Sequence, residues 1–120
     1  MLGKYCMQAR EMATDYVRPQ ENGNRTDIRH LSIHDDMGRG LTVTAERPFE
    51  ASLLPNTPED YEAAEHIHEL PERDSVTLSL RSCQTGVGGD APGMAMVLPE
   101  YQLKKGVTYT FDFCFTKTEK

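Results

Sequence analysis

The sequence has no tryptophan, no long apolar run and no excess of basic residues. Without a stretch of about 18 apolar residues, no segment suits a membrane-spanning helix. The net charge of -6, with acids and bases interspersed, argues against nucleic acid as a partner, because phosphate binding needs a basic face. The lack of tryptophan argues against an independent carbohydrate-binding module, since such modules usually stack an aromatic ring, often tryptophan, on the sugar.

Cysteine is also scarce. Cys6, Cys83 and Cys114 are odd in number and far apart, which favours buried free thiols. A single disulfide with one thiol left over is the alternative. Residues 1–4 do not resemble a secretory signal, because no apolar stretch follows Lys4. The compartment stays open, since a cut piece would hide the N-terminus of its parent.

The 120 residues are enough for one domain or for part of a larger one. Most apolar residues alternate with polar ones, which predicts β-strands with one buried face. Residues 28–33 are instead apolar on both parities, which predicts a strand covered on both faces. Short strands separated by turns indicate an all-β, antiparallel sandwich. The alternating runs are 41–45, 49–53, 76–81 and 107–116, and the turns are expected at 22–23, 35–40 and 105–106.

One segment predicts a short helix. Thr57 can cap it, Pro58 suits its first position, and Asp60 can return a hydrogen bond to the cap. We expect the helix to run to about residue 66 or 67 and to stop before Pro71. For residues 3–16 both helix and strand remain open. The residues expected to face the sheet are Tyr61, Ala64 and Ile67.

Residues 86–93 are the most glycine-dense stretch, and glycine lets a backbone bend tightly or approach a ligand closely. A phosphate-binding loop is excluded, because neither a Lys-Ser/Thr pair nor a helix start follows. A plain surface loop remains as one interpretation, and the resemblance described below adds a second one, a loop at the rim of a sugar site.

His66 and His68 lie two residues apart. In a strand they would share a face and could hold a metal, with His30 or His34 as a third ligand. At the end of a helix, positions i and i+2 diverge, so we predict structural histidines there. The spacing does not support a nucleophilic dyad of Cys83 with either histidine.

Four segments together resemble the C-terminal, small-chain-like region (domain 5) of large retaining β-galactosidases of glycoside hydrolase family 2. Their order and gaps agree over about residues 15–115, and the combination is specific where any one segment alone is weak. The segments are 16–29 with its Pro-x-Glu-Asn-Gly motif, 61–70 with its His-x-His-x-Leu tail, the Gly-x-Gly-Gly-Asp loop 86–90, and the strand-like run 98–103.

The resemblance implies the second half of a large antiparallel super-sandwich similar to galactose mutarotases. It places the catalytic glutamates in a separate TIM-barrel domain and the Gly-rich loop at the rim of the active site. The substrate-binding residues so implied are Gly88, Gly89, Asp90 and Gly93. Gly93 stands where the family usually has a tryptophan that stacks on the leaving-group sugar, so the aglycone should be bound differently. His30 also stands where relatives often have tryptophan.

The acidic residues agree with catalytic glutamates that lie in another domain. Retaining hydrolysis needs two carboxylates about 5 Å apart, one of them with a raised pKa. The acids here cluster in the expected helix and the loop after it, as on a solvated face, and no neighbours would desolvate them. We therefore predict no catalytic residue in this chain. These acids are Glu59, Asp60, Glu62, Glu65, Glu69, Glu72 and Asp74.

The resulting hypothesis is an accessory domain that completes a parent β-galactosidase and is inactive alone. Its partners would be the remaining domains, a β-galactoside at the rim of the active site and, through an exposed sheet edge, a second copy of the chain. We expect no metal or cofactor in this segment, while the parent family often uses Mg or Na elsewhere. The alternatives are a free-standing carbohydrate-binding or protein-interaction module and a mutarotase-like epimerase.

Overall fold

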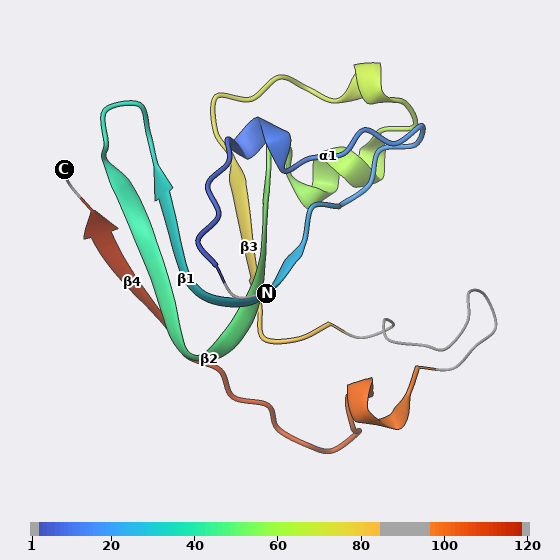
Figure 1. The fold of residues 1–120 in the computed structure, drawn as a ribbon. Coiled ribbons are helices and arrows are strands. Elements are labelled where there is room, and N and C mark those ends of the chain that lie inside the picture. The colour runs from blue at the N-terminus through green and yellow to red at the C-terminus, as the bar shows by residue number, and fades with distance from the viewer. Residues whose placement is uncertain (1–2, 85–96, 119–120) are drawn as a thin grey trace. The chain divides into compact units, whose positions relative to one another are not determined.

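The structure is a computed structural model that describes residues 3–84 and 97–118 (Figure 1). It divides into two compact units. Unit 1 comprises Met1–Ile28 and Glu50–Leu80, and unit 2 comprises Arg29–Phe49 and Arg81–Lys120. The chain passes from one unit to the other within strands β1, β2 and β3. The strands are β1 (Arg25–His34), β2 (Gly40–Leu54), β3 (Thr77–Arg81) and β4 (Phe113–Thr118).

The strands form one four-stranded sheet in the order β1-β2-β3, and β4 also pairs with β2, antiparallel. The described residues add one α-helix, α1 (Pro58–Ala63), and three 3₁₀ helices. This architecture confirms the predicted all-β, sandwich-like class with one short helix. Residues 3–16, left open by the sequence, contain only a single 3₁₀ turn. The 3₁₀ helices are η1 (Ala9–Glu11), η2 (Ile67–Glu69) and η3 (Pro99–Tyr101).

Strand β2 is longer than the sequence predicted. The runs 41–45 and 49–53 belong to one strand of 15 residues that continues through Pro48. Proline has no N–H to donate, so a strand tolerates it only where that position is not needed in a ladder. The ladder with β4 ends at Ala45, which leaves Pro48 beyond it. The last four residues of β2 are all buried, so both faces of the strand are covered there.

The turn between β1 and β2 confirms the predicted hairpin connection. The Asp35 N–H donates to the Arg39 carbonyl at 2.8 Å, and Gly38 has a φ of 79°. One Asp35 carboxylate oxygen accepts the N–H groups of Met37 and Arg39, at 3.0 and 2.8 Å. The other oxygen pairs with the Arg39 guanidinium at 2.8 Å. This aspartate therefore organises the turn locally, as Asp commonly does in turns.

Strand β4 is shorter than predicted. The sequence placed 107–116 in one strand, but β4 begins only at Phe113, where the ladder with β2 also ends. Residues before it are held by side chains instead of a ladder. Arg47 donates to the Thr110 carbonyl at 2.6 Å and lies over the Phe111 ring at 5.3 Å from its centroid.

Unit 2 has one hydroxyl-lined face and one apolar face. Thr42 bonds across β2 to Ser32 of β1 and to Thr118 of β4, both at 2.9 Å. On the other face Val43 is fully buried, while Phe115, its partner in the register, is 56% exposed. The apolar face of this sheet is therefore only partly covered within the chain. Other large side chains of unit 2 that are about half exposed or more are Met37, Tyr101, Leu103, Val107 and Tyr109.

Helix α1 of unit 1 begins as predicted and ends earlier. The Thr57 hydroxyl accepts the Asp60 N–H, the Asp60 carboxylate accepts the Thr57 N–H, and Pro58 occupies the first turn. The helix stops at Ala63 instead of residue 66 or 67. Tyr61 and Ala64 are buried as expected, but Ile67 is 44% exposed, because it lies beyond the helix in η2.

Two further predictions about burial are wrong for this chain. The three cysteines are free but exposed, not buried. Strand β1 is mostly exposed, not covered on both faces. Both errors share a cause: an apolar sequence pattern indicates that a face is suited to burial, and the covering must come from other residues. In the described part of the chain, no helix is long and apolar enough to cross a membrane.

Candidate functional site

The loop that the sequence placed at the sugar site lies outside the described residues. Gly88, Gly89, Asp90 and Gly93 all fall between the described positions 84 and 97. Their role remains a prediction.

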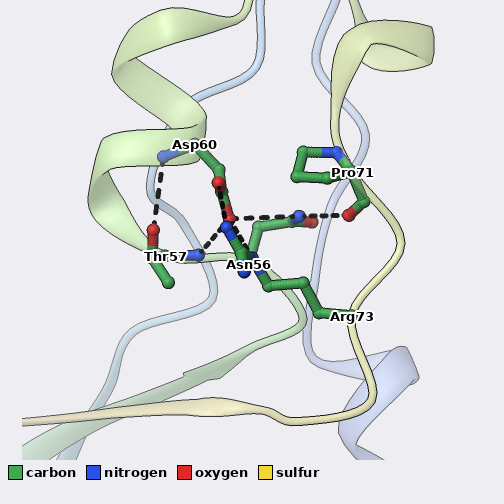
Figure 2. Close-up of polar contacts among 5 residues, drawn as sticks. All are labelled: Asn56, Thr57, Asp60, Pro71 and Arg73. Atoms are coloured by element: carbon green, nitrogen blue, oxygen red, sulfur yellow. Dashed lines mark hydrogen bonds and ion pairs between the residues drawn. The ribbon is translucent and has the colours of Figure 1, made fainter.

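A polar cluster surrounds Asp60 in unit 1, where it joins helix α1 to the loop before β3 (Figure 2). The Arg73 guanidinium makes two bonds of 2.6 Å to the Asp60 carboxylate. Asn56, which is buried, donates to the Pro71 carbonyl at 2.7 Å and to Asp60 at 3.5 Å. Because Asp60 also accepts the Thr57 N–H, a single carboxylate fixes both the helix start and the returning chain.

The electrostatics of this cluster suit a permanent anion. The Arg73 guanidinium, followed by the Thr57 N–H, holds the pKa of Asp60 well below its usual range, and partial desolvation opposes them. Such a carboxylate does not carry a proton at neutral pH, so it is suited to positioning and unsuited to acid catalysis. Every shifted carboxyl pKa in the described part of the chain is likewise lowered; the others are those of Asp35, Glu59 and Glu69.

A small hollow lies beside this cluster in unit 1. Segments 13–22, 55–56 and 61–70 contribute its lining, and its volume is about 60 Å³. Pockets for organic ligands usually measure about 300–1,000 Å³. The hollow is therefore too small to hold a sugar ring.

The two neighbouring histidines lie differently from the prediction. His66 is extended, and His68 lies in the 3₁₀ turn η2, so neither belongs to α1. Their rings do not diverge: the centroids are 5.5 Å apart and the planes differ by 26°. The His66 Nδ1 lies 3.2 Å from a carboxylate oxygen of Glu69. No set of three His, Cys, Asp or Glu side chains within residues 3–84 and 97–118 is arranged to hold a metal.

Comparison with known families decides the relationship. The family model described as β-galactosidase small chain matches residues 1–115. The chain belongs to this small-chain family. The recognition made from the four sequence segments is thereby confirmed.

Individual relatives of this chain are named β-galactosidases. The protein from Priestia megaterium is 41% identical over 104 residues, which is 87% of this chain and 10% of the relative. Those from Streptococcus thermophilus and Bifidobacterium adolescentis are 36% and 40% identical, over 93% and 85% of this chain and 11% and 10% of the relatives. The chain thus spans about a tenth of the length of these relatives.

The Pro-x-Glu-Asn-Gly motif that carried part of the resemblance has a physical explanation in unit 1. The Asn22 side chain accepts the Thr14 N–H at 2.8 Å and donates to the Thr14 and Gln20 carbonyls at 3.1 and 2.9 Å. Gly23 has a φ of 72°, and a Cβ there would lie 2.4 Å from the Met12 carbonyl oxygen. Asparagine therefore closes the loop, and glycine permits the close approach of the two segments.

Sequence reasoning missed two members of the Asp60 cluster. It predicted the capping role of Asp60, because Thr57 and Asp60 are three residues apart. No sequence pattern indicated the roles of Asn56 and Arg73. Arg73 is 13 residues from Asp60, and the irregular loop between them has no periodicity that would predict the contact. An arginine in the loop after an acidic helix start hints weakly at an ion pair. Which acid it pairs with depends on the path of that loop.

Proposed function

We propose that this chain is an accessory segment of a β-galactosidase, which completes a C-terminal β-sandwich domain and supplies no catalytic carboxylate. The observation that carries the proposal is the half-covered apolar face of the unit 2 sheet, where Phe115 is 56% exposed opposite the buried Val43. In a sandwich, such a face packs against a second sheet. The relatives, about ten times longer than this chain, contain enough additional sequence to supply that sheet.

The carboxyl groups support a non-catalytic role. A retaining glycosidase needs an acid/base whose pKa is raised and a nucleophile about 5 Å away. The shifted carboxyl pKa values among the described residues are all lowered, and that of Asp60 is lowered most visibly, by its pairing with Arg73. Glycoside hydrolysis would then depend on carboxylates elsewhere in the parent enzyme.

We further propose that loop 86–93 reaches the rim of the sugar site, with Gly88, Gly89, Asp90 and Gly93 as the residues nearest a β-galactoside. The support is the resemblance of the Gly-x-Gly-Gly-Asp sequence to the family loop. With glycine at position 93 in place of an aromatic ring, the leaving-group sugar would lose a stacking surface. The enzyme should then discriminate weakly between aglycones.

The remaining domains of the parent are the proposed partners, and the isolated chain should also associate with itself. Strand β1 lies at one end of the sheet order, and unpaired strand edges invite pairing with another chain. Light scattering over a wide concentration range should detect dimers or larger assemblies. A monomer at every concentration would contradict this part of the proposal.

The decisive experiment compares hydrolysis of a chromogenic β-galactoside by this chain alone and by the same chain joined to the upstream part of a β-galactosidase. We expect no hydrolysis by the chain alone and hydrolysis by the complete enzyme. Asp90→Ala in the complete enzyme should change KM or the aglycone preference and leave folding intact. Hydrolysis by the chain alone would show that it carries a catalytic pair and would overturn the proposal.

A further inference from the structure

The turn that follows helix α1 brings together groups that the sequence pattern placed apart. His66 has an extended backbone with φ -135° and ψ 153°, and Ile67–Glu69 forms the single 3₁₀ turn η2. This change of backbone places the imidazoles of His66 and His68 side by side, 5.5 Å between centroids. The divergence expected for positions i and i+2 of an α-helix therefore does not apply here.

Glu69 holds one of the two rings in place. One of its carboxylate oxygens accepts the backbone N–H groups of Glu65 and His66, at 2.7 and 3.2 Å. The other lies 3.2 Å from the His66 Nδ1. A proton on Nδ1 satisfies this bond and leaves the Nε2 lone pair available. Histidines that bind metals commonly use this arrangement, in which a carboxylate fixes the ring tautomer and orientation.

We propose that His66 and His68 form a two-imidazole site for a borderline divalent transition-metal ion such as Zn²⁺, with Glu69 as its positioning residue. Neutral imidazole is a ligand that suits these ions, whereas Mg²⁺ and Ca²⁺ prefer oxygen ligands. His66 keeps its orientation through Glu69, and His68 is exposed, so the His68 ring can rotate to bring its Nε2 to the Zn–N distance of about 2.0–2.1 Å from an ion bound to the His66 Nε2.

The site offers two protein ligands, and water completes the coordination. This agrees with the finding that no three ligating side chains of the described residues are arranged around one point. Two ligands with open positions predict binding that is measurable and reversible rather than a permanent structural ion. This inference concerns the exposed turn of unit 1 and does not depend on the proposed role in a β-galactosidase.

The test measures Zn²⁺ affinity of the full chain by competition with a chromophoric chelator. The exposed cysteines would also bind Zn²⁺, so the background carries Cys6→Ser, Cys83→Ser and Cys114→Ser. His66→Ala and His68→Ala are each expected to weaken binding by about 100-fold or more, since each removes a ligand. His66→Gln serves as a second variant of similar size, and far-UV circular dichroism checks that the variants keep the fold.

Glu69→Gln tests the positioning role separately. Glutamine can still accept the backbone N–H groups of the turn, but it is a weaker partner for the His66 Nδ1. We expect about a tenfold loss of Zn²⁺ affinity, the size typical of removing a group behind a ligand. An affinity unchanged by Glu69→Gln would refute that role.

The matched control replaces the other two histidines, His30→Ala together with His34→Ala, and should leave the affinity unchanged. The proposal fails if the background chain does not bind Zn²⁺ or if removal of both His66 and His68 leaves the affinity intact. It fails equally if the control variant loses as much affinity as His66→Ala.

Discussion

Unit 1 and unit 2 share strands β1, β2 and β3 but differ in how completely they bury their own apolar residues. The described part of unit 1 buries the end of β2, one side of α1 and Pro19, whereas that of unit 2 buries only Val43 and Phe49. Unit 1 therefore resembles a small core with its own closing contacts. Unit 2 resembles a sheet whose apolar face needs a partner. Two units with similar apolar content can thus bury very different shares of it.

Polar contacts widen the difference. In unit 1, Asn22 closes the loop from residue 14, and Asp60 joins the start of α1 to Arg73 thirteen residues later. In unit 2, most side-chain contacts of the described residues run between adjacent strands or within single turns, as Thr42 and Asp35 illustrate. The contact of Arg47 with the Thr110 carbonyl, ahead of β4, is an exception. Most polar contacts of unit 2 thus add to strands that already pair, whereas those of unit 1 order loops outside the sheet. Because unit 1 also buries more apolar side chains, it should resist unfolding more than unit 2.

The largest effect should come from truncating the unit 1 core. Leu54→Ala removes a side chain that is only 3% exposed, and comparable buried leucines cost about 2–5 kcal/mol of unfolding free energy. Leu103→Ala in unit 2 is the matched control, because Leu103 is 45% exposed and should cost less than about 0.5 kcal/mol. Urea denaturation measures both. Similar losses for the two leucines would remove the contrast between the units.

The second effect compares two glycines with positive φ. In Gly106→Ala of unit 2, the added Cβ has no atom within 4 Å. The substitution should therefore lower the unfolding free energy only by the cost of a left-handed alanine, about 1–2 kcal/mol. Gly23→Ala in unit 1 carries the same term and also forces a Cβ to 2.4 Å from the Met12 carbonyl. We expect its loss of unfolding free energy to exceed that of Gly106→Ala clearly. Equal losses would mean that Gly23 does not lie close to the Met12 carbonyl.

Acid should weaken unit 1 through Asp60. The folded-state pKa of Asp60 is lowered by Arg73 and the Thr57 N–H, so its contribution is fully present above the ordinary aspartate pKa. That contribution is lost as the pH falls from about 4 towards the lower folded-state value. Asp60→Asn should flatten the dependence of the unfolding midpoint on pH in this range. Asp112→Asn, at an exposed position of unit 2, should leave the dependence as in the parent chain.

The smallest effect in the isolated chain is expected at Phe115. Because its side chain is 56% exposed, Phe115→Ala should change the unfolding free energy by less than about 0.5 kcal/mol. Joined to the remainder of a β-galactosidase, the same substitution should cost about 3 kcal/mol or more if a second sheet covers this face. Thermal unfolding of both forms makes the comparison. A small effect in both would contradict the proposed covering.

Short-range patterns predicted the local structure well. Thr57, Pro58 and Asp60 identified the start of α1, Asn22-Gly23 identified a residue with left-handed φ, and the 35–40 segment identified the hairpin. These predictions hold because the interactions join residues at most four positions apart. The predictions that depended on covering failed, such as buried cysteines and a continuous buried face over 107–115.

The all-β class, the turns at 35–40 and 105–106, the helix start and the small-chain resemblance could all be inferred from the amino-acid pattern alone. Three features emerged only from the folded chain: which apolar residues are buried, the pairing of Arg73 with Asp60, and the side-by-side rings of His66 and His68. The two groups of features differ in the distance along the sequence over which the responsible interactions act. Backbone propensities and caps act between near neighbours, whereas burial and ion pairing depend on which distant segments the folded chain brings together.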